Sequence, residues 1–290
     1  MTAGTIAVTG ASGRLGGAVA RLLARADARQ ILIGRSPERL PELPGAERRG
    51  PAEYADAAAM RAALTGADAL LLVSGGLSPR RYEEHRTVIA AAQAAGVARV
   101  VYVSLIGASP VASFSHARDH WETEFTLTHS GLQSAILRPG YYASMLSAQA
   151  DADHVIHGLS AEGRISAVGH ADIAEVAAAL LLGHAPTGAE LAYDGAVYEV
   201  TGPEACTWDE ITARLRAATG LPYRAVVETP EQSVARRALT EPDPVQIERW
   251  VSWHTSVARG EAAAVTDVVE RITGHPPVTI LDVLAAAPRP

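Results

Sequence analysis

The chain contains no lysine and no asparagine, so all 25 of its basic residues are arginines. Any mechanism that depends on a catalytic lysine or asparagine is therefore excluded. Cysteine is almost as scarce, and the single Cys206 rules out an internal disulfide and a zinc site built from several cysteines. We interpret Cys206 as a small, partly buried thiol rather than a reactive one.

Long apolar runs are missing as well. No apolar segment reaches the ~18–20 residues that a transmembrane helix needs, and no basic stretch with a cleavage site opens the chain. We therefore expect no membrane partner, no signal peptide and a cytoplasmic location. The net charge of −7 argues against a nucleic-acid partner, because nucleic-acid-binding surfaces carry clustered cations.

The residues that are present favour an α/β fold. The hydrophobic content of 48% in 290 residues suffices for a substantial core. In the first half, strands are predicted at 5–8, 30–33, 69–73, 97–104 and 134–137, and helices at 16–26, 57–64, 82–95 and 116–130. Strands that are apolar on both faces and separated by helices indicate a parallel sheet covered on both sides. We predict a Rossmann-type, doubly wound parallel sheet.

The second half is less regular. Helices are predicted at 173–182 and 207–219, strands at 196–201 and 223–228, and an interrupted helical stretch at 230–272. This pattern favours a Rossmann domain over residues 1–140 and a smaller α+β lobe over residues 141–290. Some elements of that lobe are expected to return to the Rossmann sheet.

The clearest motif is a glycine-rich turn that follows the first strand and opens the first helix. Its sequence is Thr9-Gly10-Ala11-Ser12-Gly13-Arg14-Leu15-Gly16. Gly10 permits a tight turn, Gly13 lets the backbone approach a pyrophosphate, and Gly16 lets the helix pack close to the strand. The helix N-terminus adds amide donors and partial positive charge. The turn therefore predicts dinucleotide binding by the residues from Gly10 to Gly16.

The end of the second strand predicts which dinucleotide binds. NAD-selective sites place an Asp or Glu there, on the ribose 2′-hydroxyl. Arg35 occupies this place, and an arginine can pair with a 2′-phosphate through charge-assisted hydrogen bonds. We therefore predict NADP(H) as the cofactor of the first domain. Arg14 and Arg39 either assist or are solvated surface residues.

Further short segments follow in order along the chain: Ala52-Glu53-Tyr54-Ala55-Asp56, His85-Arg86, Ala94-Ala95-Gly96-Val97, Tyr102-Val103-Ser104-Leu105, His120-Trp121-Glu122-Thr123-Glu124, Leu137-Arg138-Pro139-Gly140-Tyr141-Tyr142, His170-Ala171-Asp172 and Thr273-Gly274-His275-Pro276. With the glycine-rich turn they cover nearly the whole chain. In their order and spacing the sequence resembles the NmrA-like branch of the atypical short-chain dehydrogenases. Within it, the resemblance is greatest to bacterial NADPH-dependent quinone reductases and triphenylmethane dye reductases.

The resemblance implies a cofactor that lies across the carboxyl edge of the sheet. Tyr54 would flank the adenine, and the nicotinamide would lie near Ser104 and Leu105 with Tyr142 closing over it. The residues implied to contact the cofactor beyond the turn are Tyr54, Ser74, Gly75, Gly76, Ser104, Leu105, Pro139, Gly140 and Tyr142.

Ordinary short-chain dehydrogenases use a Tyr-x-x-x-Lys pair, in which lysine lowers the pKa of the tyrosine that hands over a proton. The corresponding helix here carries His120 and Glu124 in those two places. Because the chain has no lysine elsewhere, it is not predicted to be an ordinary carbonyl-reducing member of that group.

Two functions are left. The first is an NADPH-dependent oxidoreductase that passes hydride to a quinone-like or other electrophilic small molecule, a reaction that depends mainly on positioning. Its candidate hydrogen-bond donors are Tyr142, Tyr141 and His120, with Ser104 in support. Tyr142 can equally pack on the cofactor, and His120 can be structural. The alternative is a non-catalytic NADP(H)-binding redox sensor that regulates a protein partner. The resemblance to the reductases favours the enzyme, and a homodimer is left open.

Two helical patterns remain. His116, His120 and Glu124 share the spacing of metal ligands, but no second ligand pair accompanies them, so no metal is predicted. Trp250, Trp253 and His254 lie at i, i+3 and i+4 on a predicted helix. Aromatic residues at this spacing are usually core, and lining of an acceptor pocket is the alternative.

Overall fold

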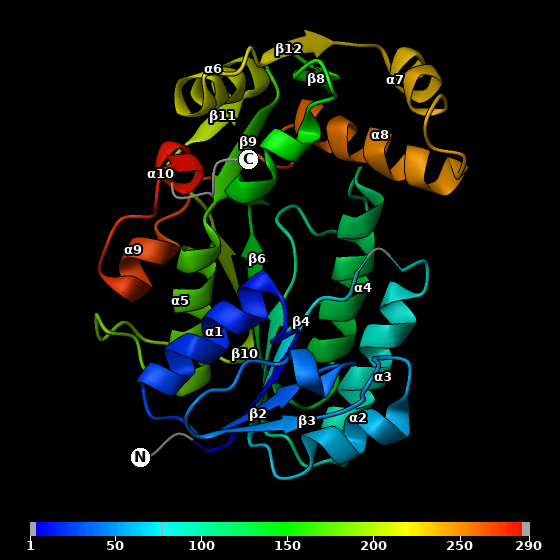
Figure 1. Ribbon diagram of the computed structural model, residues 1–290. Coiled ribbons are helices and arrows are strands. Elements are labelled where there is room, and N and C mark those ends of the chain that lie inside the picture. The colour runs from blue at the N-terminus through cyan, green and yellow to red at the C-terminus, as the bar shows by residue number, and fades with distance from the viewer. Residues whose placement is uncertain (1–3, 77, 286–290) are drawn as a thin grey trace.

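A seven-stranded parallel sheet forms the centre of the molecule, shown in Figure 1. The structure is a computed structural model that describes residues 4–76 and 78–285. In spatial order the strands are β10 (Asp194–Val200), β6 (Gln133–Pro139), β5 (Arg99–Val103), β4 (Ala69–Val73), β1 (Ile6–Thr9), β2 (Gln30–Ile33) and β3 (Ala46–Arg49). The order from β3 to β6 is that of the Rossmann dinucleotide-binding fold, so the predicted fold class is confirmed.

Helices cover both faces of the sheet (Figure 1). One face carries α1 (Arg14–Arg25), α5 (His170–Leu182) and α9 (Val268–Thr273), and the other carries α2 (Ala57–Leu64), α3 (Arg81–Ala94) and α4 (Ser115–Thr128). Along β4, Leu71 packs into the core beneath α1 and α5, whereas Leu70 and Leu72 pack into the core beneath α2 and α3. This alternation explains why the strands are apolar on both faces.

The second half of the chain contributes to both layers. Strand β10 pairs in parallel with β6, and Val200 lies opposite Pro139 in that ladder. Helix α5 packs along α1 beside the glycine-rich turn. Elements from beyond residue 140 thus complete the sheet that the first half begins.

The remaining elements form a smaller lobe beyond the carboxyl ends of the sheet strands (Figure 1). Its strands are β7 (Tyr141–Tyr142), β9 (Arg164–Val168) and β11 (Ala205–Thr207) in one sheet and β8 (Val155–Gly158) and β12 (Arg224–Val227) in another. Its helices are α6 (Trp208–Thr219), α7 (Pro230–Arg237), α8 (Pro244–Ala258) and α10 (Ile280–Ala285). The lobe also has two short 3-10 helices, η2 (Ala143–Met145) and η3 (Ser147–Gln149). A third, η1 (Pro37–Arg39), lies outside the lobe, between β2 and β3.

The predicted elements of the first half agree with the structure to within two residues at each end. Strand β3 was not predicted, because its sequence Ala-Glu-Arg-Arg is that of a charged edge strand without an apolar face. The strands β7, β8, β9 and β11 of the lobe were also missed. Strands β7 and β11, with two and three residues, are too short to establish an alternating pattern. Among residues 4–76 and 78–285, no helix has the length and apolar character required to cross a membrane.

Candidate active site

The glycine-rich turn has the geometry that a pyrophosphate site requires. Gly10 has a φ of +64°, a conformation that favours glycine, and the Gly13 amide donates to the Gly10 carbonyl over 2.9 Å. A Cβ on Gly16 would lie 2.4 Å from the Gly10 carbonyl oxygen, so only glycine lets α1 begin this close to β1. Helix α1 therefore points its free N-terminal amides at the turn.

Beside the turn lies a cavity of about 440 Å³, here called the cofactor groove. The predicted cofactor residues that line it are Gly10, Ser12, Arg35, Tyr54, Ser74, Gly75 and Gly76. Arg35 is exposed at the groove, where a 2′-phosphate could reach its guanidinium. Arg80, which sequence reasoning missed, adds a second cation. The donor set and the close backbone approach fit a phosphorylated dinucleotide.

Other predicted cofactor residues lie next to the groove rather than in its lining. Gly13 caps α1, and Leu15 is buried against the sheet in the first turn of that helix. Arg14 Nη1 lies 3.4 Å from Ser144 Oγ, which bridges the turn to the lobe. Pro139 is buried at the end of β6 and borders neither the groove nor the inner cavity described below.

The Tyr54 hydroxyl makes its hydrogen bonds to groups on β1 and β4. Its hydroxyl oxygen lies 2.7 Å from both the Val73 carbonyl oxygen and Thr9 Oγ1, so it ties the loop after β3 to β1 and β4. Burial raises the pKa of Tyr54 above its ordinary value. The phenol thus remains protonated and fixes the wall of the groove where the adenine is predicted to lie.

A second cavity, the inner cavity, has a volume of about 290 Å³ and shares Ser74 with the cofactor groove. It lies where the sheet meets the lobe, and α8 supplies part of its wall. Residues that line it are Ser74, Arg81, Ser104, Leu105, Phe114, His116, His120, Gly140, Tyr141, Tyr142, Met145, Gln246, Arg249, Trp250 and Trp253. The lining thus includes Ser104, Leu105, Gly140 and Tyr142 of the residues predicted for the nicotinamide end, but not Pro139. Both tryptophans line the cavity, whereas His254 does not.

Glu124, in the place of the absent lysine, belongs to an ion pair. Arg138 donates from Nε to Oε1 over 2.9 Å and from Nη2 to Oε2 over 2.5 Å, a bidentate arrangement. The Ser104 hydroxyl also donates to Glu124 Oε1. The only proton of Ser104 is therefore directed at Glu124, so Ser104 can accept from a ligand but does not offer it that proton.

His120 is engaged at both ring nitrogens. Arg81 Nη1 lies 3.1 Å from Nε2, and a guanidinium can only donate, so Nε2 is the unprotonated nitrogen. Nδ1 therefore carries the proton and donates to Tyr102 Oη over 2.7 Å. Burial, followed by the charge of Arg81, holds the pKa of His120 well below its usual range. This arrangement favours the structural role of His120 over that of a donor to the acceptor.

The segment formed by Gly75 and Gly76 is held from α3. Arg81 donates to the carbonyls of Gly75 and Gly76 over 2.6 and 3.2 Å, and the Gly75 amide donates to His85 Nε2 over 2.9 Å. Sequence reasoning missed Arg81, although its place at the start of the helix after two glycines was a usable signal. Burial lowers the pKa of His85 to about 3, so its ring stays neutral and accepts this bond.

Two candidate donors, Tyr142 and Tyr141, keep a hydroxyl proton that no acceptor among the described residues takes up, since Tyr141 Oη only accepts, from Gln149 Nε2. Tyr142 has no hydrogen bond at all in these ranges. Its ring packs against His170 with 4.5 Å between centroids, and its oxygen has no hydrogen-bond partner among residues 4–76 and 78–285. Burial raises the pKa of Tyr142 to about 12, so the hydroxyl keeps its proton at neutral pH. In the same described ranges, no group of three or more His, Cys, Asp or Glu side chains is arranged to hold a metal ion.

Residues 10–183 match the model of a family described as NAD(P)H-binding. The matched segment includes the glycine-rich turn, the sheet residues that line the two cavities, and α5. The chain belongs to this family. Escherichia coli quinone oxidoreductase 2 is 32% identical over 286 residues, which cover 96% of each chain. A (4-alkanoyl-5-oxo-2,5-dihydrofuran-3-yl)methyl phosphate reductase of Streptomyces griseus is 35% identical over 277 residues, 93% of each chain.

A crystal structure of the Escherichia coli NADPH-dependent quinone oxidoreductase complexed with NADPH is also similar. Its TM-score is 0.82 at 28% identity, and the match covers 97% of this chain and 98% of that one. These similarities confirm the predicted family resemblance and the predicted nicotinamide dinucleotide cofactor. The chain is an NAD(P)H-dependent oxidoreductase, as predicted.

The neutral state of His85 predicts a loss of stability in acid. The pKa of His85 is about 3 in the folded protein and 6.5 in the unfolded chain, so the unfolded chain binds the extra proton. Stability from this site is therefore complete above pH 6.5 and declines as the pH falls toward 3. When the pH is lowered from 7.5 to 5.5, the free energy of unfolding of the wild type should fall by about 1.4 kcal/mol more than that of His85→Gln, which lacks this titrating group. Urea unfolding at both pH values measures this, and an equal loss in both proteins would contradict it.

Proposed function

We propose that the protein transfers hydride from NADPH to a quinone-like or other electron-poor conjugated acceptor. The observation that carries the proposal is the inner cavity, which adjoins the cofactor groove at Ser74. Its aromatic wall, with Phe114, Trp250 and Trp253, suits a flat ring. The two relatives named above support the same class, since one is named for quinones and the other for an unsaturated lactone.

In this mechanism the residues of the chain mainly bind and orient. The glycine-rich turn and Arg35 hold the phosphates, and bound NADPH supplies the hydride. The walls of the inner cavity hold the acceptor against the nicotinamide end and exclude water, which supplies catalysis through proximity. Tyr142 donates a hydrogen bond to the acceptor oxygen as negative charge develops there. A proton from Tyr142 or from solvent then completes the two-electron reduction.

A spectrophotometric assay tests the proposal directly. The protein is mixed with NADPH and a panel of benzoquinones and naphthoquinones, and the nicotinamide absorbance band is followed. We expect enzyme-dependent oxidation of NADPH with at least one acceptor and none with the corresponding hydroquinones. Oxidation no faster than background with every acceptor, in a protein that binds NADPH, would instead favour a non-catalytic redox sensor.

Arg35 is expected to select NADPH over NADH. Replacement of Arg35 by alanine removes a charge-assisted partner of the 2′-phosphate and should raise the Kd for NADPH about tenfold or more. The Kd for NADH should stay the same, because NADH lacks that phosphate. Fluorescence titration with each nucleotide measures both constants. Arg39→Ala is the matched control, since Arg39 is exposed and does not line the groove. Equal weakening of both nucleotides by Arg35→Ala would be inconsistent with this role.

The hydroxyl of Tyr142 is expected to act in the reduction itself. Tyr142→Phe removes one hydrogen-bond donor from the inner cavity and should lower kcat about tenfold or more with NADPH affinity retained. Stopped-flow turnover and nucleotide titration separate the two effects. Tyr82→Phe is the control, because that hydroxyl pairs with Thr126 on the outside of α3 and α4. An unchanged kcat in Tyr142→Phe would assign the ring a packing role only.

A further inference from the structure

Tyr141 and Tyr142 bring two phenol hydroxyls to the inner cavity from consecutive positions of β7. The proposed reduction uses only that of Tyr142. Consecutive residues of a strand point to opposite sides, and the packing of the two rings agrees with this. Tyr142 packs with the core beneath α1 and α5, whereas Tyr141 packs with the core of the lobe. The cavity is therefore bordered by two phenols that are anchored in different parts of the molecule.

The Tyr141 side chain is held by neighbours in the lobe. Its ring stacks on Trp253 with 4.9 Å between centroids and an interplanar angle of 22°, and Trp253 makes an edge contact with Phe114 over 5.5 Å. Its hydroxyl oxygen accepts from Nε2 of Gln149, a buried residue of η3. Because both the ring and the oxygen are held, the phenol is positioned before any ligand enters.

The contact with Gln149 determines where the Tyr141 proton points. A phenol hydroxyl has one proton to donate and can also accept, and here the amide N–H occupies the accepting side. The O–H is therefore turned away from Gln149. No acceptor among residues 4–76 and 78–285 takes up its proton, and no acidic residue is found among the described residues that line the cavity. Burial raises the pKa of Tyr141 above its ordinary value, so the proton stays on the phenol at neutral pH.

A 1,4-quinone can use two donors at once. Its reduction adds one hydride from NADPH, which becomes NADP⁺, and one proton. The electron pair of the hydride spreads through the conjugated ring, so that both oxygens gain negative charge before the proton converts the hydroquinone monoanion to the hydroquinone. A donor at each oxygen stabilises this charge more than a donor at one end. An acceptor with a single carbonyl oxygen can use only one of the two phenols.

We propose that Tyr141 is a second hydrogen-bond donor to the acceptor, and that the site selects conjugated acceptors with carbonyl oxygens at two ends of the ring. Gln149 is the positioning residue that orients the Tyr141 hydroxyl. The inference rests on the proposed function, which identifies the inner cavity as the acceptor site. It narrows the substrate class from electron-poor conjugated molecules in general to 1,4-dicarbonyl acceptors such as para-quinones.

Two acceptors of similar size test the inference. 2-Methyl-1,4-naphthoquinone has two carbonyl oxygens, and 2-methylinden-1-one has one. Tyr141→Phe should lower kcat/KM about tenfold for the naphthoquinone and less than about twofold for the indenone, which has no second oxygen to lose a bond. Tyr142→Phe should lower kcat/KM for both. Equal effects of Tyr141→Phe on the two acceptors would overturn the inference, and no effect on either would mean that the phenol gives its proton to Gln149.

Tyr223→Phe is the matched control for Tyr141→Phe. Tyr223 is a buried tyrosine of the same lobe core, but it is not among the described residues that line the inner cavity. Its replacement should leave kcat/KM for both acceptors unchanged. A loss as large as that in Tyr141→Phe would trace the effect to the lobe core and count against a second donor. Thermal melting and NADPH titration of each variant check folding and cofactor binding.

A double variant tests the role of Gln149. Gln149→Leu removes the amide that orients the hydroxyl and should lower the ratio of kcat/KM for the naphthoquinone to that for the indenone about threefold. Tyr141→Phe/Gln149→Leu should have the same ratio as Tyr141→Phe alone, because Gln149 acts on the acceptor only through the Tyr141 hydroxyl. A further fall of the ratio in the double variant would contradict this positioning role.

Binding without turnover separates this inference from the proposed function. In calorimetric titrations with NADP⁺ present, Tyr141→Phe should bind the naphthoquinone about fivefold or more weakly than the wild type and the indenone equally well. If no acceptor is reduced and this difference persists, the proposed function fails and the second donor stands. If the quinone is reduced and Tyr141→Phe binds both ligands as the wild type does, the second donor fails and the proposed function stands.

The wild type alone supplies a measurement that does not depend on the folding of any variant. It should bind the naphthoquinone about fivefold or more tightly than the indenone in the same titrations, because only the naphthoquinone can accept from both phenols. Equal affinities for the two ligands would overturn the inference.

Discussion

The guanidinium of Arg81 connects the two halves of the site. It donates to the carbonyls of Gly75 and Gly76, which border the cofactor groove, and to Nε2 of His120, which borders the inner cavity. Arg81 therefore fixes both the backbone at Gly75 and Gly76 and the tautomer of His120. Because Arg81 is buried at the start of α3, the position of that helix sets how the groove and the cavity join at Ser74. Loss of the Arg81 guanidinium would remove the hydrogen bonds to Gly75 and Gly76 at the cofactor groove and to His120 at the inner cavity.

The absence of lysine has a structural counterpart in Glu124. Glu124 stands where the sequence resemblance predicted the lysine position, and Arg138 neutralises its carboxylate from the neighbouring strand β6. The Ser104 hydroxyl is drawn into the same pair. Glu124, Arg138 and Ser104 together support the ends of β5 and β6. Among the described residues, the inner cavity still offers the phenol hydroxyls of Tyr141 and Tyr142, which is consistent with chemistry that depends on positioning.

Local sequence patterns predicted the parts of the site that local structure determines. The turn at Gly10 needs a positive φ and α1 needs a glycine at position 16, so both requirements can be recognised in the sequence as glycines. The inner cavity has no such local pattern, because Arg81, His116 and Arg249 lie on three helices that only the tertiary fold brings together. His120 was predicted as a candidate donor and lines the inner cavity, but its tautomer depends on Arg81, which is 39 positions away. Among the strands of the lobe, β12 was predicted, whereas β7 and β11 were missed because two or three residues cannot establish a period.

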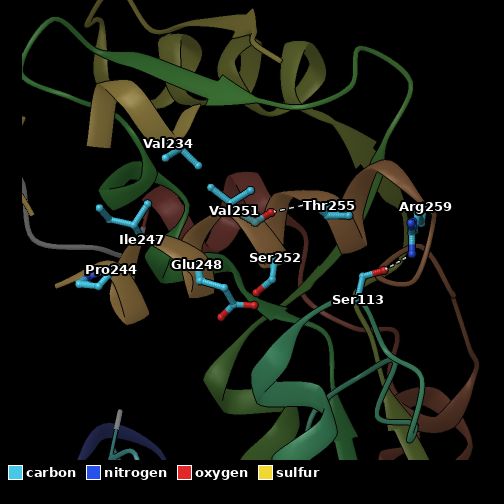
Figure 2. Close-up of a pocket in the computed structure, with 9 residues that line it drawn as sticks. All are labelled: Ser113, Val234, Pro244, Ile247, Glu248, Val251, Ser252, Thr255 and Arg259. Carbon is cyan, nitrogen blue, oxygen red and sulfur yellow. Dashed lines mark hydrogen bonds between the residues drawn. The ribbon is translucent and has the colours of Figure 1, made fainter. Parts of the chain in front are cut away.

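Helix α8 shows how one element of the lobe can control specificity. Gln246, Arg249, Trp250 and Trp253 recur at helical spacing and face the inner cavity. The opposite side, with Ile247, Val251 and Thr255, lines the outer groove in Figure 2. Arg237 of α7 stacks on Trp250 at 4.3 Å from the ring centroid and so holds the cavity wall from outside. Because none of these α8 residues lines the cofactor groove, the inner cavity can change by substitution on α8 while the cofactor groove stays the same.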